Sequence, residues 1–111
     1  MDYQFEEKWR ETLKYLETRF EQPIDLQAAL FLIGVQELGK GFGTFKKDEK
    51  LALMHIAVCR ILEPFGYYQF THKDDDGWPH FNEIKKLPPL EATDQQQLIK
   101  EAVINYLEVE V

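Results

Sequence analysis

Two stretches of this chain are apolar on every side of a helix, and they restrict the fold more than any other feature. The segment Ala28–Val35 carries no charged side chain, and the segment Leu51–Leu62 is apolar nearly all round. A helix without a polar face lies inside a protein. Asp25 is a favourable N-cap for the first helix and Gly39 follows its last turn. Because the connection between the two helices is short, we expect them to form an antiparallel pair in the core.

Two amphipathic helices are expected to cover this pair. The last begins at a capping box formed by Thr93 and Gln96 and continues with an apolar stripe over Leu98–Leu107. The first runs from about Asp2 to Glu21 and carries a stripe at spacings of three and four residues: Phe5, Trp9, Leu13, Leu16 and Phe20.

The segment between the third and last helices has a different pattern. Tyr67–His72 is aromatic and roughly alternating, Asp76-Gly77 is a strong hairpin turn, and Trp78–Leu87 is the return segment. Pro79 lacks an amide donor, which restricts the return segment to an edge or broken strand. The predicted fold is mainly α: a four-helix domain with a two-stranded β-hairpin inserted before the last helix, with α+β as the alternative class. Residues 1–111 are expected to form a single domain.

Composition and charge exclude several classes of partner. The 111 residues are 44% hydrophobic, which is enough for a core, and the formal net charge is -7. That charge disfavours binding to nucleic acids and to anionic membrane surfaces. The single cysteine, Cys59, cannot form an intramolecular disulfide, and the first residues lack the basic and apolar regions of a signal peptide. We therefore expect a cytoplasmic protein with no nucleic-acid or membrane partner.

A family resemblance is carried by four segments: LFLIGVQELGKG, DEKLALMHIAVCRIL, FGYY and DDDGWPH. They resemble a family of small, uncharacterised bacterial proteins of about this length, over most of the chain from Leu26 to about Leu90. The resemblance implies a standalone bacterial cytoplasmic domain and brings no activity or catalytic residues to carry over.

Residues 72–83 read HKDDDGWPHFNE and raise the question of a calcium loop. An EF-hand loop aligned on Gly77 places Asp74, Asp76 and Glu83 at ligand positions, but a histidine takes the first position, where a carboxylate is expected. The preceding segment also has the pattern of a strand. The stretch is therefore interpreted as a hairpin turn with solvated aspartates and a glycine that supplies a positive φ.

Aromatic residues flank this turn and are candidates for a binding surface, because aromatics with a polar group are frequent anchors of binding. A regular two-residue turn pairs His72 with Phe81 and leaves the two hairpin histidines diagonal, which argues against a two-histidine metal site. The alternative is that the aromatics only cover the open end of the helical core. The candidate binding residues are Tyr67, Tyr68, Trp78 and His80.

His55 and Cys59 stand one helical turn apart on the third helix. This spacing suits two metal ligands or a thiolate–imidazole pair, and Glu37 is a candidate third group. Gly34 can let the second and third helices approach closely. Because the neighbouring residues are apolar, we expect both side chains to be buried and structural, with an inert thiol.

The loop Gly39–Phe45 and the residues after it contain a basic patch. Lys40, Lys46 and Lys47 lie beside a helix N-terminus, where an anion can bind. The spacing is not that of a phosphate-binding P-loop, since the glycines follow a helix and Thr44 is not preceded by lysine. The alternative is a solvated loop that binds nothing.

Two classes of function remain open at this level. The favoured one is a non-enzymatic protein-interaction module or homo-oligomer, because no polar group of residues has a catalytic spacing. The alternative is a small-molecule-binding protein or enzyme with a pocket near His55 and Cys59 and the hairpin residues Trp78 and His80. No cofactor and no metal are expected.

Overall fold

The computed structural model describes residues 3–41, 43–87 and 92–110. The predicted fold is confirmed: four helices, with a two-stranded antiparallel hairpin before the last. The predicted start of the first helix at Asp2 lies outside the described residues. The elements are α1 (Tyr3–Phe20), α2 (Leu26–Leu38), α3 (Lys47–Leu62), the short 3₁₀ helix η1 (Glu63–Phe65), β1 (Tyr68–Lys73), β2 (Pro79–Glu83) and α4 (Ala92–Glu110).

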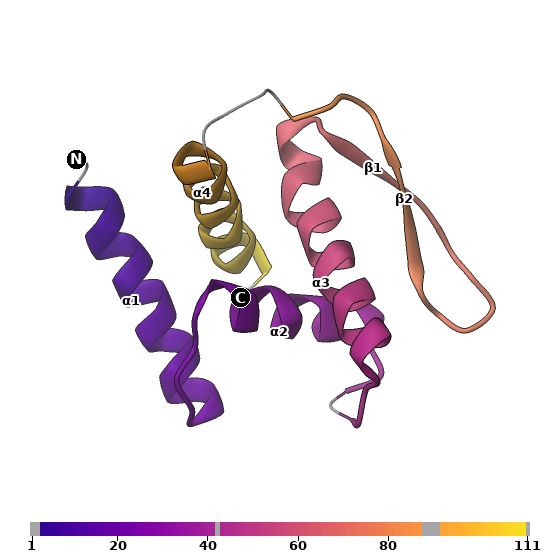
Figure 1. Ribbon diagram of the computed structural model, residues 1–111, viewed down its shortest axis with the longest axis horizontal. Helices are drawn as coiled ribbons and strands as arrows, with labels where there is room; N and C mark the ends of the chain where they lie inside the picture. The colour runs from indigo at the N-terminus through magenta and orange to yellow at the C-terminus, as the bar shows by residue number, and fades with distance from the viewer. Residues whose placement is uncertain (1–2, 42, 88–91, 111) are drawn as a thin grey trace.

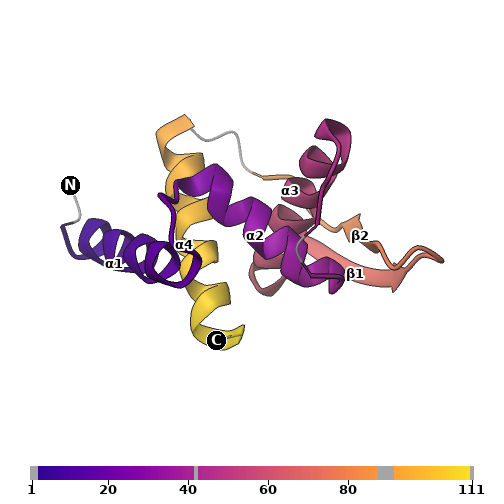
Figure 2. The ribbon, with the colours of Figure 1, turned by 90° about the horizontal axis from the view of Figure 1, so that it is seen from below.

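The helices form an open arrangement with the hairpin at one edge. In Figure 1, α4 lies between α1 and α3, and the hairpin extends from the far side of α3. The view from below shows α2 crossing α4 and reaching α3 (Figure 2). Among the described residues, none of the helices combines the length and the apolar composition needed to cross a lipid bilayer.

The two apolar helices, α2 and α3, cross each other in both views rather than lie side by side as the expected antiparallel pair (Figures 1 and 2). Their contact is close at Gly34, where an added Cβ would stand 2.2 Å from the backbone oxygen of Leu53. The prediction that Gly34 permits a close approach is therefore confirmed. Most of α2 is buried, as predicted, whereas α3 leaves Leu51 60% exposed.

The main core joins all four helices. Trp9 of α1, Ile33 of α2, Ile61 of α3 and Val103 of α4 belong to one cluster of buried side chains. A smaller cluster lies where α2 and α3 meet the hairpin. It consists of Val35, Leu38 and Leu53, with Phe31, Phe45 and Trp78 packed against it.

Local signals define the ends of α2. The Asp25 carboxylate accepts the N–H of Ala28 at 2.8 Å, and Gly39 adopts a φ of 75° after the last turn. Both agree with the prediction from sequence. The predicted capping box of the last helix is wrong in position, because α4 begins at Ala92 and Thr93 already lies within its first turn.

The hairpin register differs from the predicted one in two places. The loop has three residues, 75–77, since the N–H of Asp74 bonds to the carbonyl of Trp78 at 3.0 Å. The strand then shifts register at Thr71, whose hydroxyl donates to the carbonyl of His80 at 3.0 Å. The three-residue loop places His72 directly opposite His80, and their rings stack with centroids 4.9 Å apart. The expectation that the two histidines are diagonal is therefore wrong.

Candidate functional site

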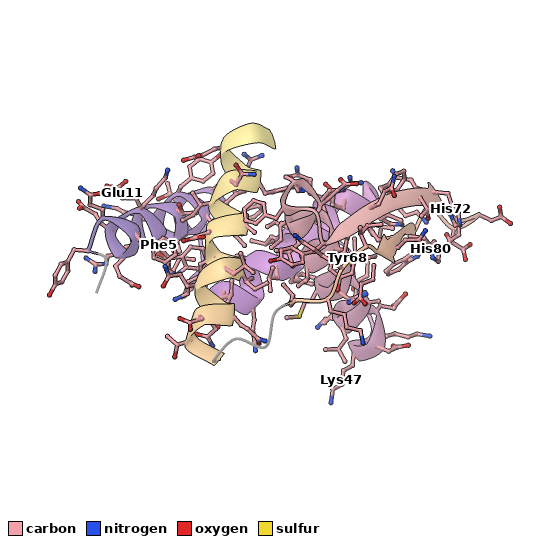
Figure 3. The ribbon with its side chains drawn as sticks, turned by 90° about the horizontal axis from the view of Figure 1, so that it is seen from above. Phe5, Glu11, Lys47, Tyr68, His72 and His80 are labelled. Atoms are coloured by element: carbon pink, nitrogen blue, oxygen red, sulfur yellow. The ribbon has the colours of Figure 1, made fainter. Side chains whose placement is uncertain are left out.

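A hollow of about 370 Å³ lies between α3 and the hairpin. One wall comes from a face of α3 that includes the buried side chains of Ile56 and Cys59, and the other comes from the loop end of the hairpin. Figure 3 shows His72 and His80 at this outer end, far from α4. The lining residues are Ala52, His55, Ile56 and Cys59 on one side and Asp74, Trp78, Pro79, His80 and Phe81 on the other.

Asp74 organises the hairpin side of this hollow. Its Oδ1 accepts the N–H groups of Asp76 at 3.0 Å and Trp78 at 2.9 Å, which fixes the turn. Its Oδ2 lies 3.0 Å from Nε2 of His80. The hydrogen bond with His80, followed by that from the Trp78 amide, holds the pKa of Asp74 below its ordinary value. The aspartate-rich stretch is thus a turn built by one carboxylate, and that carboxylate also orients an imidazole.

The ionised carboxylate defines the tautomer of neutral His80. A carboxylate can only accept hydrogen bonds, so Nε2 of His80 carries the hydrogen and Nδ1 keeps a free lone pair. An imidazole fixed in this way by a carboxylate can accept a hydrogen bond or a proton from a bound molecule. Sequence reasoning chose His80 but missed Asp74 as its partner. One sequence signal could have identified Asp74: an aspartate just before a hairpin turn tends to accept a hydrogen bond from the backbone N–H two residues later.

Cys59 and His55 form the floor on the α3 side. Cys59 is 2% exposed, and its sulfur lies 3.6 Å from Nε2 of His55. Burial, with a smaller effect of the Glu83 carboxylate, raises the pKa of the Cys59 thiol to about 11. The thiol is therefore protonated at neutral pH and is a poor nucleophile. The expectation that both side chains are buried is wrong for His55, which is exposed because its face of α3 borders the hollow.

Glu37, the suggested third group of this site, lies elsewhere. Its carboxylate accepts from Nε of Arg60 at 2.7 Å and from the hydroxyl of Tyr106 at 2.7 Å. Arg60 also pairs with Glu63 at 2.7 Å and places its guanidinium 5.0 Å from the centroid of the Phe81 ring. We call these four polar residues, Glu37, Arg60, Glu63 and Tyr106, the Arg60 network. It joins α2, α3, η1 and α4, and none of its four residues lines the hollow, although Arg60 packs over Phe81, which does.

The aromatic candidates divide between two roles. Tyr67 and Tyr68 are half-buried and pack against the main core, so they act as its cover. Figure 3 shows Tyr68 on the body side of the hairpin, away from its loop. Trp78 packs against the smaller cluster and also lines the hollow. Of these three residues, Trp78 is therefore placed to contact a ligand there.

The three lysines of the basic patch have separate surroundings. The N–H of Lys46 at the start of α3 bonds to the carboxylate of Glu49 at 2.8 Å, so a carboxylate already stands beside this helix N-terminus. The ammonium group of Lys40 donates to the carbonyl of Asp76 in the hairpin loop. Lys47 extends away from the body of the molecule (Figure 3). The three lysines thus act separately, and Lys40 fastens the hairpin loop to the α2–α3 connection.

A second hollow, of about 360 Å³, lies between α1 and α4. The ion pair between Lys8 and Glu108, 2.7 Å long and exposed, stands at its edge. Its lining includes Tyr15, which is 42% exposed, and the apolar side chains of Ile104 and Leu107. Sequence reasoning did not predict this groove.

Within the described part of the chain, no three His, Cys, Asp or Glu side chains gather closely enough to hold a metal ion. Comparison with protein-family models, with curated proteins and with solved structures finds no match to this chain. The function is therefore argued from the site alone.

Proposed function

We propose that this protein binds a small organic molecule in the hollow between α3 and the hairpin. The observation that carries the proposal is the His80 imidazole, held by Asp74 at 3.0 Å on the wall of a hollow of about 370 Å³. Ligand sites are typically concave and largely apolar, with a few polar groups that fix the ligand's orientation. Here the apolar surface comes from Ile56, Trp78 and Phe81.

The chemistry of the lining favours binding, with proton transfer as the reaction available to it. Nδ1 of His80 can accept a proton from a bound molecule, and Asp74 stabilises the imidazolium that results. Covalent catalysis by Cys59 is disfavoured because its thiol is protonated at neutral pH. A lone free thiol is also suited to the reducing cytoplasm, where we place the protein.

The test is a fragment screen followed by NMR of the isotopically labelled protein. Fragments that bind should shift the signals of the Trp78 indole and of the His80 ring. His80→Ala should weaken their binding by about tenfold, the effect of losing one hydrogen bond from the site. His72→Ala is the matched control, because His72 stacks on His80 but does not line the hollow.

Two results would contradict the proposal. One is a screen in which no fragment shifts signals from either wall of the hollow. The other is a set of fragments whose binding weakens equally in His80→Ala and His72→Ala, because the loss would then come from the hairpin as a whole.

A protein-interaction role is the second candidate, and the groove between α1 and α4 is the observation that favours it. Tyr15 borders this groove and is 42% exposed, whereas Tyr3 on the same helix is 76% exposed and lies outside it. If the groove mediates self-association, light scattering should show an oligomer that Tyr15→Glu dissociates and Tyr3→Glu leaves intact. A monomer at all concentrations would exclude this role for the groove.

A further inference from the structure

We infer that the hollow between α3 and the hairpin selects small ligands that combine an apolar body with a positively charged amine, and disfavours anions. This inference rests on the proposed function, since it names the class of ligand that the same site takes. It is carried by the charges, the hydrogen-bond acceptor and the aromatic surface that the lining presents.

The charge at the lining is negative. Of the residues that line the hollow, Asp74 is the one with a full charge when both histidines are neutral. Hydrogen bonds from His80 and from the Trp78 amide stabilise its ionised form. A cation entering the hollow is attracted by the Asp74 carboxylate, and an anion is repelled by it.

Arg60 adds little positive charge to the hollow, because two carboxylates compensate it. Arg60 lies over the ring of Phe81, but its guanidinium pairs with Glu37 and Glu63 at 2.7 Å each. Lys40 keeps its positive charge at the hairpin loop, because the Asp76 carbonyl to which it donates is neutral. Neither Arg60 nor Lys40 belongs to the lining of the hollow.

The remaining groups suit an amine attached to an apolar body. Nδ1 of neutral His80 is an acceptor, and a ligand ammonium group is a strong donor. The indole of Trp78 is the aromatic surface with the strongest attraction for cations. Ile56 and Phe81 provide apolar walls for the rest of the ligand.

The experiment uses three probes that share one aromatic ring and differ in charge: benzylamine, benzyl alcohol and benzoate. Each is titrated into the full chain at neutral pH, and binding is followed through the NMR signals of Trp78 and His80. Benzylamine should bind about tenfold more tightly than benzoate, with benzyl alcohol between them, as expected for a cation and an anion near one partly exposed carboxylate. Added salt should narrow this difference.

Asp74→Asn should reduce the preference for benzylamine, because asparagine can keep the turn but loses the charge. Asp75→Asn is the matched control: Asp75 is the next residue, is exposed and does not line the hollow. A larger loss in Asp74→Asn than in Asp75→Asn supports the inference, and equal losses contradict it.

The wild-type titrations distinguish a wrong ligand class from a wrong proposed function. If benzoate binds in the hollow as tightly as benzylamine or more tightly, the ligand class is wrong and the proposed function stands. If no probe shifts signals from the hollow, the proposed function fails and the inference fails with it.

Discussion

Two polar clusters of this molecule differ in their surroundings. The Arg60 network connects α3 with α2, η1 and α4, and its charged groups bond to one another. The cluster around His80 lies at the loop end of the hairpin and faces a hollow. The difference suggests separate roles: polar groups that satisfy one another stabilise the fold, whereas polar groups that keep bonding capacity beside a hollow are available to a ligand.

The exposed fractions of the side chains agree with this division. Arg60 and Glu37 are 25% and 15% exposed, whereas His80 and Asp74 are 51% and 38% exposed. Less screening by water makes an ion pair stronger and also makes it more costly to remove one partner. Mutations in the Arg60 network should therefore change the free energy of unfolding, and mutations around His80 should change ligand binding.

The largest effect is expected for Arg60→Ala. This change leaves Glu37 and Glu63 without their cation and removes a guanidinium that packs over the rings of Phe70 and Phe81. We expect the free energy of unfolding to fall by about 2–4 kcal/mol, measured by chemical denaturation. Arg10→Ala, an exposed position on α1, is the control and should change it by less than about 0.5 kcal/mol. Equal effects of the two changes would show that the network is not structural.

A smaller loss is expected for Cys59→Ser. The side chain is almost fully buried, and a hydroxyl is harder to bury than a thiol, so the free energy of unfolding should fall by about 1–2 kcal/mol. Fragment binding in the hollow should persist. If binding disappears while stability is unchanged, Cys59 contacts the ligand and the division between the two clusters is wrong.

Tyr106→Phe removes one hydroxyl from the Arg60 network. That hydroxyl donates to Glu37 at 2.7 Å and accepts from Gln36 at 3.0 Å. Because Arg60 remains to pair with Glu37, we expect a loss of about 1 kcal/mol in the free energy of unfolding. Tyr15→Phe, at an exposed tyrosine of α1, is the control. No difference between these two variants would show that the hydrogen bond to Glu37 adds nothing.

The reactivity of Cys59 tests whether the thiol at the floor of the hollow is protonated and inert. Burial raises the pKa of the thiol from 9.0 to about 11, so at neutral pH the thiolate fraction is roughly a hundredfold lower than in the unfolded chain. Alkylation by iodoacetamide should therefore be slow in the folded protein and should accelerate in denaturant. Rapid alkylation without denaturant would show that the thiol is activated and would restore it as a candidate nucleophile.

The smallest effect is a shift in the titration of Asp74. Its pKa is lowered in the folded protein by the hydrogen bonds from His80 and from the Trp78 amide. A carboxyl with a lowered folded pKa stabilises the fold above its unfolded pKa, and this contribution is lost as the pH falls through the folded pKa. His80→Ala should raise the midpoint toward the ordinary aspartate value, as followed by NMR of the carboxyl carbon. An unchanged midpoint would show that His80 does not bond to Asp74 in solution.

The features predicted from sequence depend on contacts between residues close in the chain. The apolar character of α2, its Asp25 cap and its Gly39 end are all local, and each agrees with the structure. The hairpin was predicted from its turn signal, but its register was not. The register depends on the bond between Asp74 and Trp78 that closes the loop and on the bond from the Thr71 hydroxyl to His80 across the strands. Neither bond follows from alternation along a strand.

The site residues also show that sequence patterns predict local contacts but not contacts between distant segments. His55 was expected inside the core because its neighbours are apolar, yet the structure directs its face of α3 toward the hairpin. Glu37 was assigned to the site by its place on α2, whereas Tyr106, far along the chain, draws it into the Arg60 network. Both corrections concern contacts between distant segments, which local patterns do not define.

Native mass spectrometry of freshly purified protein, beside its denatured mass, tests the central claim most directly. It reports the oligomeric state and any retained small molecule in one experiment. A monomer with the extra mass of a small organic molecule, retained in His72→Ala and reduced in His80→Ala, is the predicted result. A multimer without extra mass, unchanged by His80→Ala, would contradict the account and favour the groove between α1 and α4 as the functional surface.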